Sequence, residues 1–557
     1  MSEKKKEIVK VLTRIADLLE FKGENQFKIK AYRNGASAIK KFEGDISELV
    51  SNENPVKIKG VGKGILSVIK DYLENGFSTE LEKLSEEIPE KISELFEIKG
   101  LGIKKIRALY ENLGIASVDD LKSALENGKL AESKILPDKT LEKIENEIKK
   151  FEERGKFFLL NEAEQIAEEV KTLIKKNIAS VKKIEVSGEL RRVREIISKI
   201  EFVVLREKGG SENFEKELGD LFRFEKSADT ISTTDADIYE LGNFAKRSVY
   251  LYVTESKSDF VKINFLRTGN DEFIGAFNLE EEFNKEREIF EKNSYEYCIP
   301  EVREQKPQNI SARTSDLCFG EMKGMLHFHT VWSDGHNSLE EMVRAGKELG
   351  FEYFAVCDHS KSAYYANGLN EERLSEQKKL VAEISEKHGV TIMHGNEVDI
   401  LPDGSLDFPD DVLASLDFVV ASVHSNFRLS EAEMTSRIIK AVENPYVNVL
   451  GHPTGRLLLR RDPYAVNILK VIDACAANNV AIEINANPWR LDLDWRNLDY
   501  ARKRGAIFSI NADAHSTGDI AYTKLGVKIA RKGGVNQSEV INYWDINRLR
   551  EFIASKR

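Results

Sequence analysis

Metal-binding side chains recur at the ends of short apolar runs in the C-terminal part of the sequence. Histidine, aspartate or glutamate closes each of the runs MLHFHT, YFAVCDHS, TIMHGNEVDI, DFVVASVHS, VNVLGHPTG and AIFSINADAHS, and an SDG loop follows the first. All nine histidines of the chain lie between His327 and His515. The residues that fit the pattern are His327, His329, Asp334, His359, Glu397, His424, His452, Asp513 and His515.

These nine side chains predict a cluster of divalent metal ions. One ion takes about four to six ligands, so nine suit two or three ions, and mixed imidazole and carboxylate donors suit zinc, manganese or iron. Ions held in this way bind phosphate oxygens, lower the pKa of a bridging water and stabilise a leaving oxygen, which predicts a phosphoester substrate. Packing in a core is the alternative for a lone histidine. His336, His388 and His394 fall outside the pattern and are predicted to be surface or packing residues.

The elements that would position these ligands are alternating strands and helices. From residue 324 onward short apolar strands alternate with helical segments, and the ligand-type residues stand where the strands end. His327 and His329 are two residues apart and therefore point to the same side of a strand. This arrangement predicts a (β/α) barrel whose active site lies at the C-terminal rim of its strands.

A second recurring pattern lies in the N-terminal part. The sequence Ile-Lys-Gly-hydrophobe-Gly occurs in KIKGVGKGILSVIK and again in EIKGLGIKKIRALYE, each time between amphipathic helical segments. Glycine permits a tight hairpin, and N–H groups at the next helix start can face a phosphate. Residues 1–70 also carry 15 Lys and Arg against 9 Asp and Glu. These helix-hairpin-helix patterns predict binding to the DNA backbone. The residues expected to contact DNA here are Gly60, Gly62, Lys63, Gly100, Gly102 and Lys104.

The ligand motifs resemble a known family. Together these motifs resemble the full signature of a PHP (polymerase and histidinol phosphatase) domain, and they are HFH, SDG, DHS, the Glu of GNEVDI, SVH, GHP and DAH. The stretch GHPTGRLLLRRDPY resembles the PHP domain of bacterial and archaeal family X DNA polymerases, called PolX. The hairpins, AYR at 31–33 and IPEVRE at 299–304 fit the same family. The resemblance covers nearly the whole chain. It implies a metal-dependent 3′–5′ exonuclease and 3′-phosphoesterase, and some members also cut at abasic sites.

Arg456 follows the His452 motif, and two interpretations of it are open. As a catalytic residue its guanidinium would hold a phosphate of the substrate. Alternatively it forms a structural salt bridge, which is about as common a role for a single arginine. The sequence does not decide between the two.

The stretch RRVREIISKIEFVVL departs from the palm of PolX-like polymerases, which carry Gly-Ser, two arginines and then Asp-x-Asp. The arginine pair is present, but Lys199 and Glu201 fall on the two aspartates and Glu189 falls on the serine. The third carboxylate is expected on a later strand in KINFLR, where Asn264 stands. An ammonium group repels magnesium, an amide adds no charge, and Glu189 puts an anion where a triphosphate would bind. Magnesium is therefore not expected at the palm, and polymerase activity is predicted to be lost.

One rival site for polymerase metals is the Asp235-x-Asp237 pair in TTDADIY. These carboxylates could substitute for the missing ones. However, the pair lies between the expected strands and does not follow the arginines, and Asp-x-Asp also occurs in ordinary turns.

The lyase activity of related polymerases is also in doubt. Alignment from GVG without gaps places Val68 where the resemblance implies a Schiff-base lysine. Binding of a 5′-phosphate is better preserved, because Lys28, Lys63 and Lys70 remain available for it. Lys28 and Arg33, the latter in the AYR motif, complete the residues expected to contact DNA.

Composition restricts the cellular context. The four cysteines are scattered without a CxxC pair, which predicts reduced thiols and a cytoplasmic location. The N-terminus MSEKKKEIVK lacks the apolar stretch of a signal peptide, and no run of about 18 apolar residues is present, so no membrane association is expected. The net charge of −11 argues weakly against nucleic acid, but the local placement of charge matters more. A monomer is expected.

The combined prediction is a multidomain chain. It consists of an all-α helix-hairpin-helix part, an α+β nucleotidyltransferase-like palm and a C-terminal (β/α)7-type PHP barrel. The expected domains are a lyase-like domain at 1–90, a fingers-like domain at 91–155, the inactive palm and thumb at 156–310, and the PHP domain at 324–557, with a linker near 300–323.

The predicted function is a DNA-repair nuclease or phosphoesterase acting on gapped, nicked or 3′-blocked DNA. The main alternative is an active family X polymerase with a proofreading PHP domain. A DNA-binding scaffold without chemistry, and a small-molecule phosphatase of the histidinol-phosphate kind, are two further alternatives.

Overall fold

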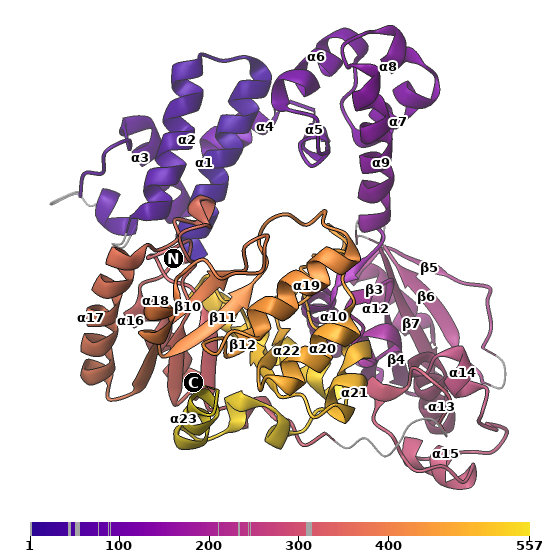
Figure 1. Cartoon of the computed structure of the whole chain (residues 1–557). Coiled ribbons are helices and arrows are strands. Elements are labelled where there is room, and N and C mark those ends of the chain that lie inside the picture. The colour runs from indigo at the N-terminus through magenta and orange to yellow at the C-terminus, as the bar shows by residue number, and fades with distance from the viewer. Residues whose placement is uncertain are drawn as a thin grey trace. The chain divides into compact units, whose positions relative to one another are not determined.

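The computed structural model describes residues 3–42, 46–50, 56–75, 77–86, 88–89, 91–209, 211–231, 234–242, 244, 247–307 and 315–556 (Figure 1). The chain divides into two compact units, Met1–Arg154 and Gly155–Arg557. None of the described helices combines the length and the apolar character needed to cross a membrane. The finer domain boundaries expected near residues 90 and 310 stay predictions.

The first unit is helical. Its buried core is built from apolar residues at helical spacing, such as Leu12, Ile15 and Leu19. The two hairpin glycines Gly60 and Gly100 have φ of +94° and +95°, a backbone conformation that favours glycine, and α3 and α6 begin three residues later. The elements are α1 (Glu3–Lys22), α2 (Gln26–Lys41), η1 (Ile46–Val50), α3 (Lys63–Asn75), α4 (Thr79–Glu86), α5 (Ile92–Leu95), α6 (Ile103–Leu113), α7 (Val118–Glu126), α8 (Lys129–Glu132) and α9 (Asp138–Arg154).

The second unit begins with a mixed sheet, here called the palm. Its five strands run in the order β2-β4-β7-β6-β5, with β4 and β7 parallel and the other neighbours antiparallel. A separate antiparallel pair joins β1 and β3. The elements are β1 (Phe158–Leu159), α10 (Leu160–Asn177), β2 (Val181–Ser187), α11 (Gly188–Arg191), β3 (Ile196–Ile197), β4 (Lys199–Arg206), α12 (Ser211–Leu221), β5 (Phe224–Lys226), β6 (Asp237–Leu241), β7 (Ser248–Thr254), α13 (Lys257–Thr268), α14 (Asp271–Ile274), α15 (Glu286–Lys292) and η2 (Pro300–Val302).

The rest of the second unit is a nearly closed barrel of seven parallel strands, β8 to β14, in sequence order. A bridge between Phe328 and Ala514 links the first strand to the end of the last. A short 3-10 helix, η4 (Phe319–Glu321), precedes the barrel. The strands are β8 (Gly324–Phe328), β9 (Tyr353–Val356), β10 (Thr391–Asp399), β11 (Phe418–Ser422), β12 (Val449–Leu450), β13 (Ala481–Asn485) and β14 (Phe508–Asn511). The helices are α16 (Leu339–Glu348), η5 (Tyr364–Ala366), α17 (Glu371–His388), α18 (Asp410–Ala414), α19 (Glu431–Val442), α20 (Ile468–Ala477), α21 (Trp495–Lys503), η6 (Thr517–Tyr522), α22 (Thr523–Lys532), η7 (Gln537–Glu539), η8 (Ile541–Tyr543) and α23 (Ile546–Ala554).

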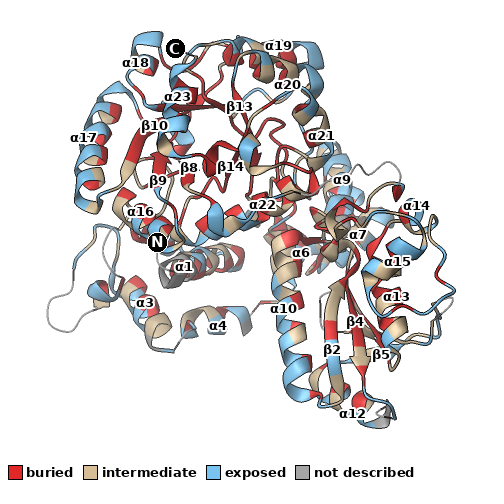
Figure 2. Cartoon of the chain, turned by 90° about the horizontal axis from the view of Figure 1, so that it is seen from below, coloured by how far each residue is buried: buried red, intermediate tan, exposed pale blue. Residues whose placement is uncertain are grey.

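The barrel strands are covered on both faces, so they are continuous apolar runs and not alternating ones. Figure 2 shows these strands as buried, with exposed outer surfaces on α17 and α19. Ser338 and Ser430 cap α16 and α19 through their side chains, each paired with a glutamate three residues later. These caps define where each helix begins after its strand.

One expectation about this unit is wrong. The segment KINFLR (262–267) was expected to be a strand, but it lies in α13. Ser256 caps this helix by accepting a hydrogen bond from the Asp259 N–H, and both sides of the helix are buried, which hides its helical period. Of the predicted linker near 300–323, residues 308–314 lie outside the described residues, whereas its first residues form η2 and include the wholly buried Arg303, which pairs with Glu286 of α15.

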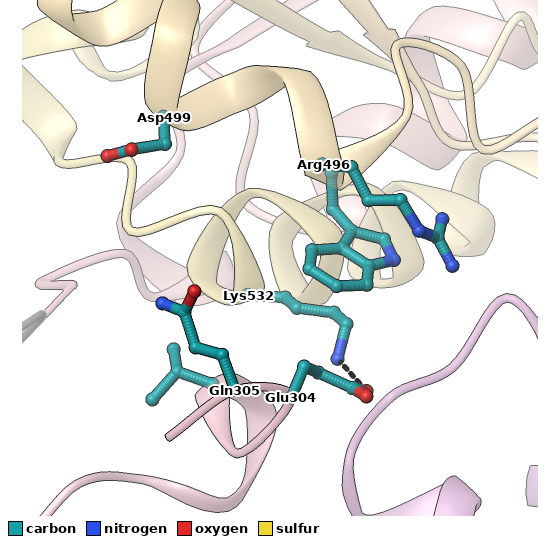
Figure 3. Close-up of a pocket in the computed structure, with 7 residues that line it drawn as sticks. Glu304, Gln305, Arg496, Asp499 and Lys532 are labelled. Atoms are coloured by element: carbon teal, nitrogen blue, oxygen red, sulfur yellow. Dashed lines mark hydrogen bonds and ion pairs between the residues drawn. The ribbon is translucent and has the colours of Figure 1, made fainter. Parts of the chain in front are cut away.

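The palm and the barrel share a polar seam that contains a small cavity (Figure 3). Lys532, at the end of α22, is fully buried and donates hydrogen bonds to the carbonyls of Arg192 and Glu301 at 2.8 Å and to Glu304 at 2.7 Å. Arg496 of the barrel pairs with the palm residue Glu195 at 2.6 Å. The two substructures are therefore joined by fixed charged contacts.

Candidate metal centre

The nine predicted ligands come together at one end of the barrel. His327 and Glu397 stand on β8 and β10, and the other ligands follow the strand ends in sequence. Because the carboxyl ends of all parallel strands open on the same rim, residues almost 190 positions apart meet there. The structure thus assembles in space what the sequence presents as separate motifs.

Glu397 lies at the centre of the cluster and is fully buried. Its Oε1 is 2.9 Å from Nε2 of His452 and 3.4 Å from Nε2 of His424. Its Oε2 is 3.0 Å from Nδ1 of His359. The same oxygen is 3.6 Å from Nε2 of both His327 and His329. Glu397 therefore faces five imidazoles, a position from which one carboxylate can bridge two cations.

The remaining ligands surround two aspartates. Oδ1 of Asp513 is 3.0 Å from Nε2 of His329. Oδ1 of Asp334 is 3.3 Å from Nε2 of His515 and 3.6 Å from Nε2 of His359. Three overlapping groups of side chains could each hold an ion. The first group is His329, Asp334, His359 and His515, the second is His327, His329 and Asp513, and the third is His359, Glu397 and His424.

The donor chemistry fits divalent cations. Nε2 of His327, Nδ1 of His329, His359 and His452, and Oε2 of Glu397 are buried and make no hydrogen bond. Buried polar atoms without a partner are costly, and a cation coordinated by these atoms would satisfy them. A mixture of imidazole nitrogens and carboxylate oxygens is a normal ligand set for zinc or another divalent transition metal. The residues present therefore fit a metal cluster, and they do not by themselves identify the metal.

The protonation of the cluster follows from its burial and its mixed charges. Burial alone would raise the pKa of Glu397, but His424, His359 and His327 outweigh it and hold that pKa well below its ordinary value. Burial, with help from His515 and His359, lowers the pKa of His329 to about 4. An ionised carboxylate and a neutral imidazole are the forms that coordinate metals.

Three further carboxylates orient the ligands, and the sequence analysis missed them. Glu483 on β13 accepts from Nδ1 of His327 at 2.6 Å, and Asp399 on β10 contacts Nδ1 of His424 at 2.5 Å. Asp358 accepts from the backbone N–H and the hydroxyl of Thr330, the residue after His329. Such partners hold ligand rings in place and increase their basicity. The available signal was a carboxylate inside an otherwise apolar strand, as in VAIEINANP.

Arg456 makes structural contacts in this geometry, and its catalytic role stays a prediction. Its side chain is buried, pairs with Asp494 and donates to the carbonyls of Arg490 and Leu491. All three guanidinium nitrogens are used in this way, which is the salt-bridge alternative. The arginine that does reach the cluster is Arg490, whose Nε is 3.6 Å from Oδ2 of Asp513.

In the palm, Glu201 is buried and surrounded by hydrogen-bond donors and cations. Nε of Arg267 donates to its Oε1 at 2.8 Å and the Tyr252 hydroxyl donates at 2.9 Å, while Nζ of Lys199 lies 3.4 Å away. Nη2 of Arg267 approaches the same oxygen at 2.5 Å. The carboxylate charge is thus compensated by protein groups.

Asn264 does not occupy the third carboxylate position, because it lies on α13. Its amide donates to Glu185 on β2 at 2.9 Å. The strand that runs parallel to β4 is β7, and its sequence SVYLYVT contains no carboxylate. On β7, the side chain that contacts Glu201 is Tyr252, through its hydroxyl. Glu189 accepts hydrogen bonds from the backbone and hydroxyl of Ser198 at 2.6 and 2.7 Å.

The Asp235 and Asp237 pair does not form a metal site in this geometry. Asp237 begins β6 and pairs with Arg206 at 3.1 Å and with Lys226 at 2.9 Å. Because β6 runs antiparallel to β7, Asp237 lies opposite Val253, at the far end of β4 from Lys199. Within the described parts of the chain, these aspartates join no group of three potential ligands.

The predicted DNA-contacting residues lie on the first unit. Gly60, Gly62 and Lys63 are exposed at the first hairpin, and Gly100, Gly102 and Lys104 are exposed at the second. Lys28 pairs with Glu80 at 3.5 Å, and Arg33 pairs with Asp17 and Glu20, so both of these cations have acidic neighbours. Val68, at the position of the expected lyase nucleophile, is buried.

Comparison with known proteins matches two family models. A helix-hairpin-helix domain matches residues 3–77, and a PHP domain matches residues 325–487. DNA polymerase/3′-5′ exonuclease PolX of Bacillus subtilis is 34% identical over 568 aligned residues, which cover 99% of each chain. A probable phosphatase of Thermoanaerobacter sp. is 28% identical over 42% of this chain and 94% of its own length. A probable phosphatase of Caldicellulosiruptor saccharolyticus is 30% identical over 39% of this chain and 90% of its own.

Proposed function

Because the chain belongs to the PolX family, we propose that it is a metal-dependent 3′–5′ exonuclease and 3′-phosphoesterase that has lost polymerase activity. Its substrate is a gapped, nicked or 3′-blocked DNA, and its role is in DNA repair. The PHP barrel performs the chemistry, and the helix-hairpin-helix unit binds the DNA backbone. The polymerase-like palm is a retained scaffold that connects to the barrel through the seam of Lys532.

The observation that carries this proposal is the contrast between two glutamates. Glu397 faces five imidazoles, including four with a ring nitrogen that makes no hydrogen bond, and these groups can accept a cation. Glu201 faces Arg267, Lys199 and a tyrosine hydroxyl, none of which coordinates magnesium. Two-metal polymerisation needs several free carboxylates, and among the described residues the predicted palm positions Lys199, Glu201 and Asn264 offer none.

In the nuclease reaction the cluster residues hold the ions, and the groups behind them fix the geometry. Bound divalent ions supply Lewis-acid activation of water and neutralisation of the developing phosphate charge. Glu483 and Asp399 keep the rings of His327 and His424 oriented through their Nδ1 atoms. Arg490, beside Asp513, adds a positive charge where a phosphate oxygen would lie.

The test is incubation of the protein with gapped DNA, 5′-labelled on the strand whose 3′ end borders the gap, and manganese, with and without dNTPs. The proposal predicts shortening of the labelled strand in both reactions and extension in neither. His359→Ala should abolish shortening while DNA binding persists, which separates the nuclease from a scaffold without chemistry. Extension in the presence of dNTPs would reject the loss of polymerase activity.

A working polymerase with a proofreading barrel is the second candidate, and one observation favours it. The Bacillus subtilis protein that aligns along the whole chain has DNA polymerase in its name. If this candidate is correct, primer extension is robust and is lost on Asp235→Ala and Asp237→Ala substitution. If extension persists in that double variant, those aspartates do not serve it.

A small-molecule phosphatase is the third candidate, because relatives named probable phosphatases align with this chain. The two hairpins of the N-terminal unit weigh against it, since a small metabolite needs no surface for a DNA backbone. Steady-state rates on a 3′-phosphorylated oligonucleotide and on histidinol phosphate distinguish them. The nuclease proposal expects the oligonucleotide to have the higher kcat/KM.

A further inference from the structure

Two adjacent tyrosines beside the metal cluster are exposed. Tyr364 and Tyr365 form η5, five and six residues after the ligand His359, and their side chains are 86% and 65% exposed. Their rings are in edge contact, with centroids 6.1 Å apart and planes inclined at 77°. Large aromatic side chains are rarely left in water as a contiguous pair unless they bind something.

The loop that carries these tyrosines is held on both sides. The hydroxyl and backbone N–H of Ser362 bind Asp407 at 2.5 and 2.7 Å, and the Asn367 amide binds the carbonyl of Trp332 at 3.1 Å. Gly368 packs so closely that a Cβ there would lie 1.9 Å from the carbonyl of Ser360. The tyrosines are therefore presented on a fixed support, which lowers the entropic cost of binding.

Both anchors connect the loop to metal-ligand segments. Trp332 lies two residues before Asp334, and the N–H of Asp407 binds the carbonyl of Asp399, the partner of His424. The loop that begins at His359 is thus fixed between two other sides of the cluster. The two tyrosines accordingly lie at its mouth.

The electrostatics agree with this placement. Burial of the hydroxyl end and the nearby carboxylates of Asp399 and Glu397 raise the pKa of Tyr365, and Arg490 opposes them. Burial and the nearby Arg490 lower the pKa of Arg461, and Tyr365 is among the neighbours that oppose this shift. Tyr365 therefore lies within electrostatic reach of the cluster and of both arginines, and the residue is at the same time 65% exposed.

The arginines give the same mouth a phosphate-binding character. Arg490 reaches the cluster at Asp513, as described above. Arg461 is held by the carbonyl of Gly455 at 2.7 Å and lies over the ring of Phe427 at 4.4 Å. Aromatic faces beside arginines form the usual surface for single-stranded nucleic acid, since unpaired bases stack and phosphates bind cations.

We propose that Tyr364 and Tyr365 form a stacking platform for the unpaired terminal base of a single-stranded DNA 3′ end, whose phosphates Arg461 and Arg490 hold. This inference rests on the proposed nuclease function and adds its substrate form. A base inside a duplex is already stacked on its neighbours, so the platform favours frayed or single-stranded ends. Stacking has little base preference, so all four bases should be accepted.

The experiment compares two single-stranded oligonucleotides that differ only at the 3′ terminus, one with a normal nucleotide and one with an abasic tetrahydrofuran residue. For the normal substrate, the Tyr364→Ala/Tyr365→Ala double variant should raise KM between about 5- and 150-fold, the range that loss of one stacked base covers. For the abasic substrate the double variant and the unaltered protein should have the same KM. The Tyr364→Phe/Tyr365→Phe variant should behave as the unaltered protein does. Equal losses on both substrates, or no loss on either, would overturn the platform.

A matched control is Tyr446→Ala, which removes a tyrosine ring between α19 and β12, at the opposite end of the barrel strands. It should leave the discrimination between the two substrates unchanged. A second readout does not depend on hydrolysis. A single strand with a 3′-terminal 2-aminopurine and a cleavage-resistant phosphorothioate linkage should lose fluorescence on binding, and the Ala double variant should restore it. If the unaltered protein shortens no DNA but quenches this probe, the nuclease proposal fails and the platform stands. Absence of quenching rejects the platform.

Discussion

Two buried glutamates, Glu201 in the palm and Glu397 in the barrel, occupy opposite chemical situations. Both are at most 2% exposed. Glu201 is neutralised by Arg267 and Lys199, which carry permanent charge and offer no lone pair to a metal. Glu397 is neutralised by imidazoles, which can release a proton and coordinate a cation.

The difference shows that a carboxylate is not a metal ligand by its own nature. Burial imposes the same demand on both glutamates, because an ionised carboxylate must be compensated. In the palm the protein provides the compensation itself, and the result is a structural ion pair. In the barrel the compensation is left to groups that suit an exchangeable cation. The identity of the neighbouring side chains therefore separates a buried ion pair from a candidate metal site.

The largest expected effect comes from Glu397→Gln. The amide cannot carry the charge that bridges two cations, so the barrel should lose bound metal and DNA shortening should fall about 1000-fold or more. Elemental analysis of the purified protein and the rate on 5′-labelled DNA measure the two effects. The matched substitution Glu201→Gln should change neither. Metal loss from the palm variant in place of the barrel variant would reverse the comparison.

The seam between the two regions gives the next largest effect. Lys532→Met removes three buried hydrogen bonds and leaves two carbonyls and Glu304 without their donor, which should lower the free energy of unfolding by about 3 kcal/mol. Thermal unfolding measures the change. Lys528→Met is a suitable control on the same helix, because Lys528 makes one partly exposed ion pair with Glu164 and should cost under about 1 kcal/mol. Equal losses of unfolding free energy in the two variants would show that the buried contacts of Lys532 do not stabilise the protein.

A smaller effect is expected within the palm. Glu201→Gln leaves Arg267 without a charged partner and should destabilise the protein by about 2 kcal/mol, with nuclease activity retained. Urea denaturation measures the loss. Lys199→Met should cost less than Glu201→Gln, because Lys199 is more exposed and lies farther from the carboxylate. A Glu201→Gln variant that is as stable as the unaltered protein would mean that Glu201 is not a structural ion pair.

The smallest effect is a pH dependence at the seam. Glu195 is buried, which alone would raise its pKa, but Arg496 outweighs burial and lowers the pKa from 4.5 to about 2. A carboxyl with a depressed folded-state pKa contributes stability above pH 4.5, and this contribution is lost as the pH falls toward 2. Between pH 7 and pH 3.5 the loss from this group is about 1 kcal/mol. Denaturation curves of the unaltered protein and of Glu195→Gln should therefore converge as the pH is lowered across that range. A stability difference between the two proteins that stays constant across this pH range would contradict the lowered pKa of Glu195.

The sequence alone allowed the ligand set and the hairpins to be predicted, because each depends on local patterns. Strand ends in a parallel barrel share one rim, so His327 and His515 could be expected to meet without knowledge of their coordinates. Gly60 and Gly100 could be recognised because a left-handed turn before a helix requires glycine.

Other assignments needed the tertiary structure, since they depend on neighbours that are distant in sequence. Asn264 was misplaced because α13 is buried on both sides, and its mixture of polar and apolar residues resembles a strand. The sequence left Arg456 between a phosphate contact and a salt bridge, and only the fold shows that Asp494 and two backbone carbonyls take up its guanidinium. Tyr252, Arg267 and Lys532 carried no local signal, because their partners lie 51 or more residues away.

The amino-acid sequence by itself determined which side chains of this protein are capable of binding metal and that Lys199 and Glu201 stand where the family resemblance implies paired aspartates. Only the tertiary structure decided which carboxylates are free to bind a cation, because that depends on the charge of the groups packed around each one. Imidazoles surround Glu397, whereas a guanidinium, an ammonium and a phenol surround Glu201.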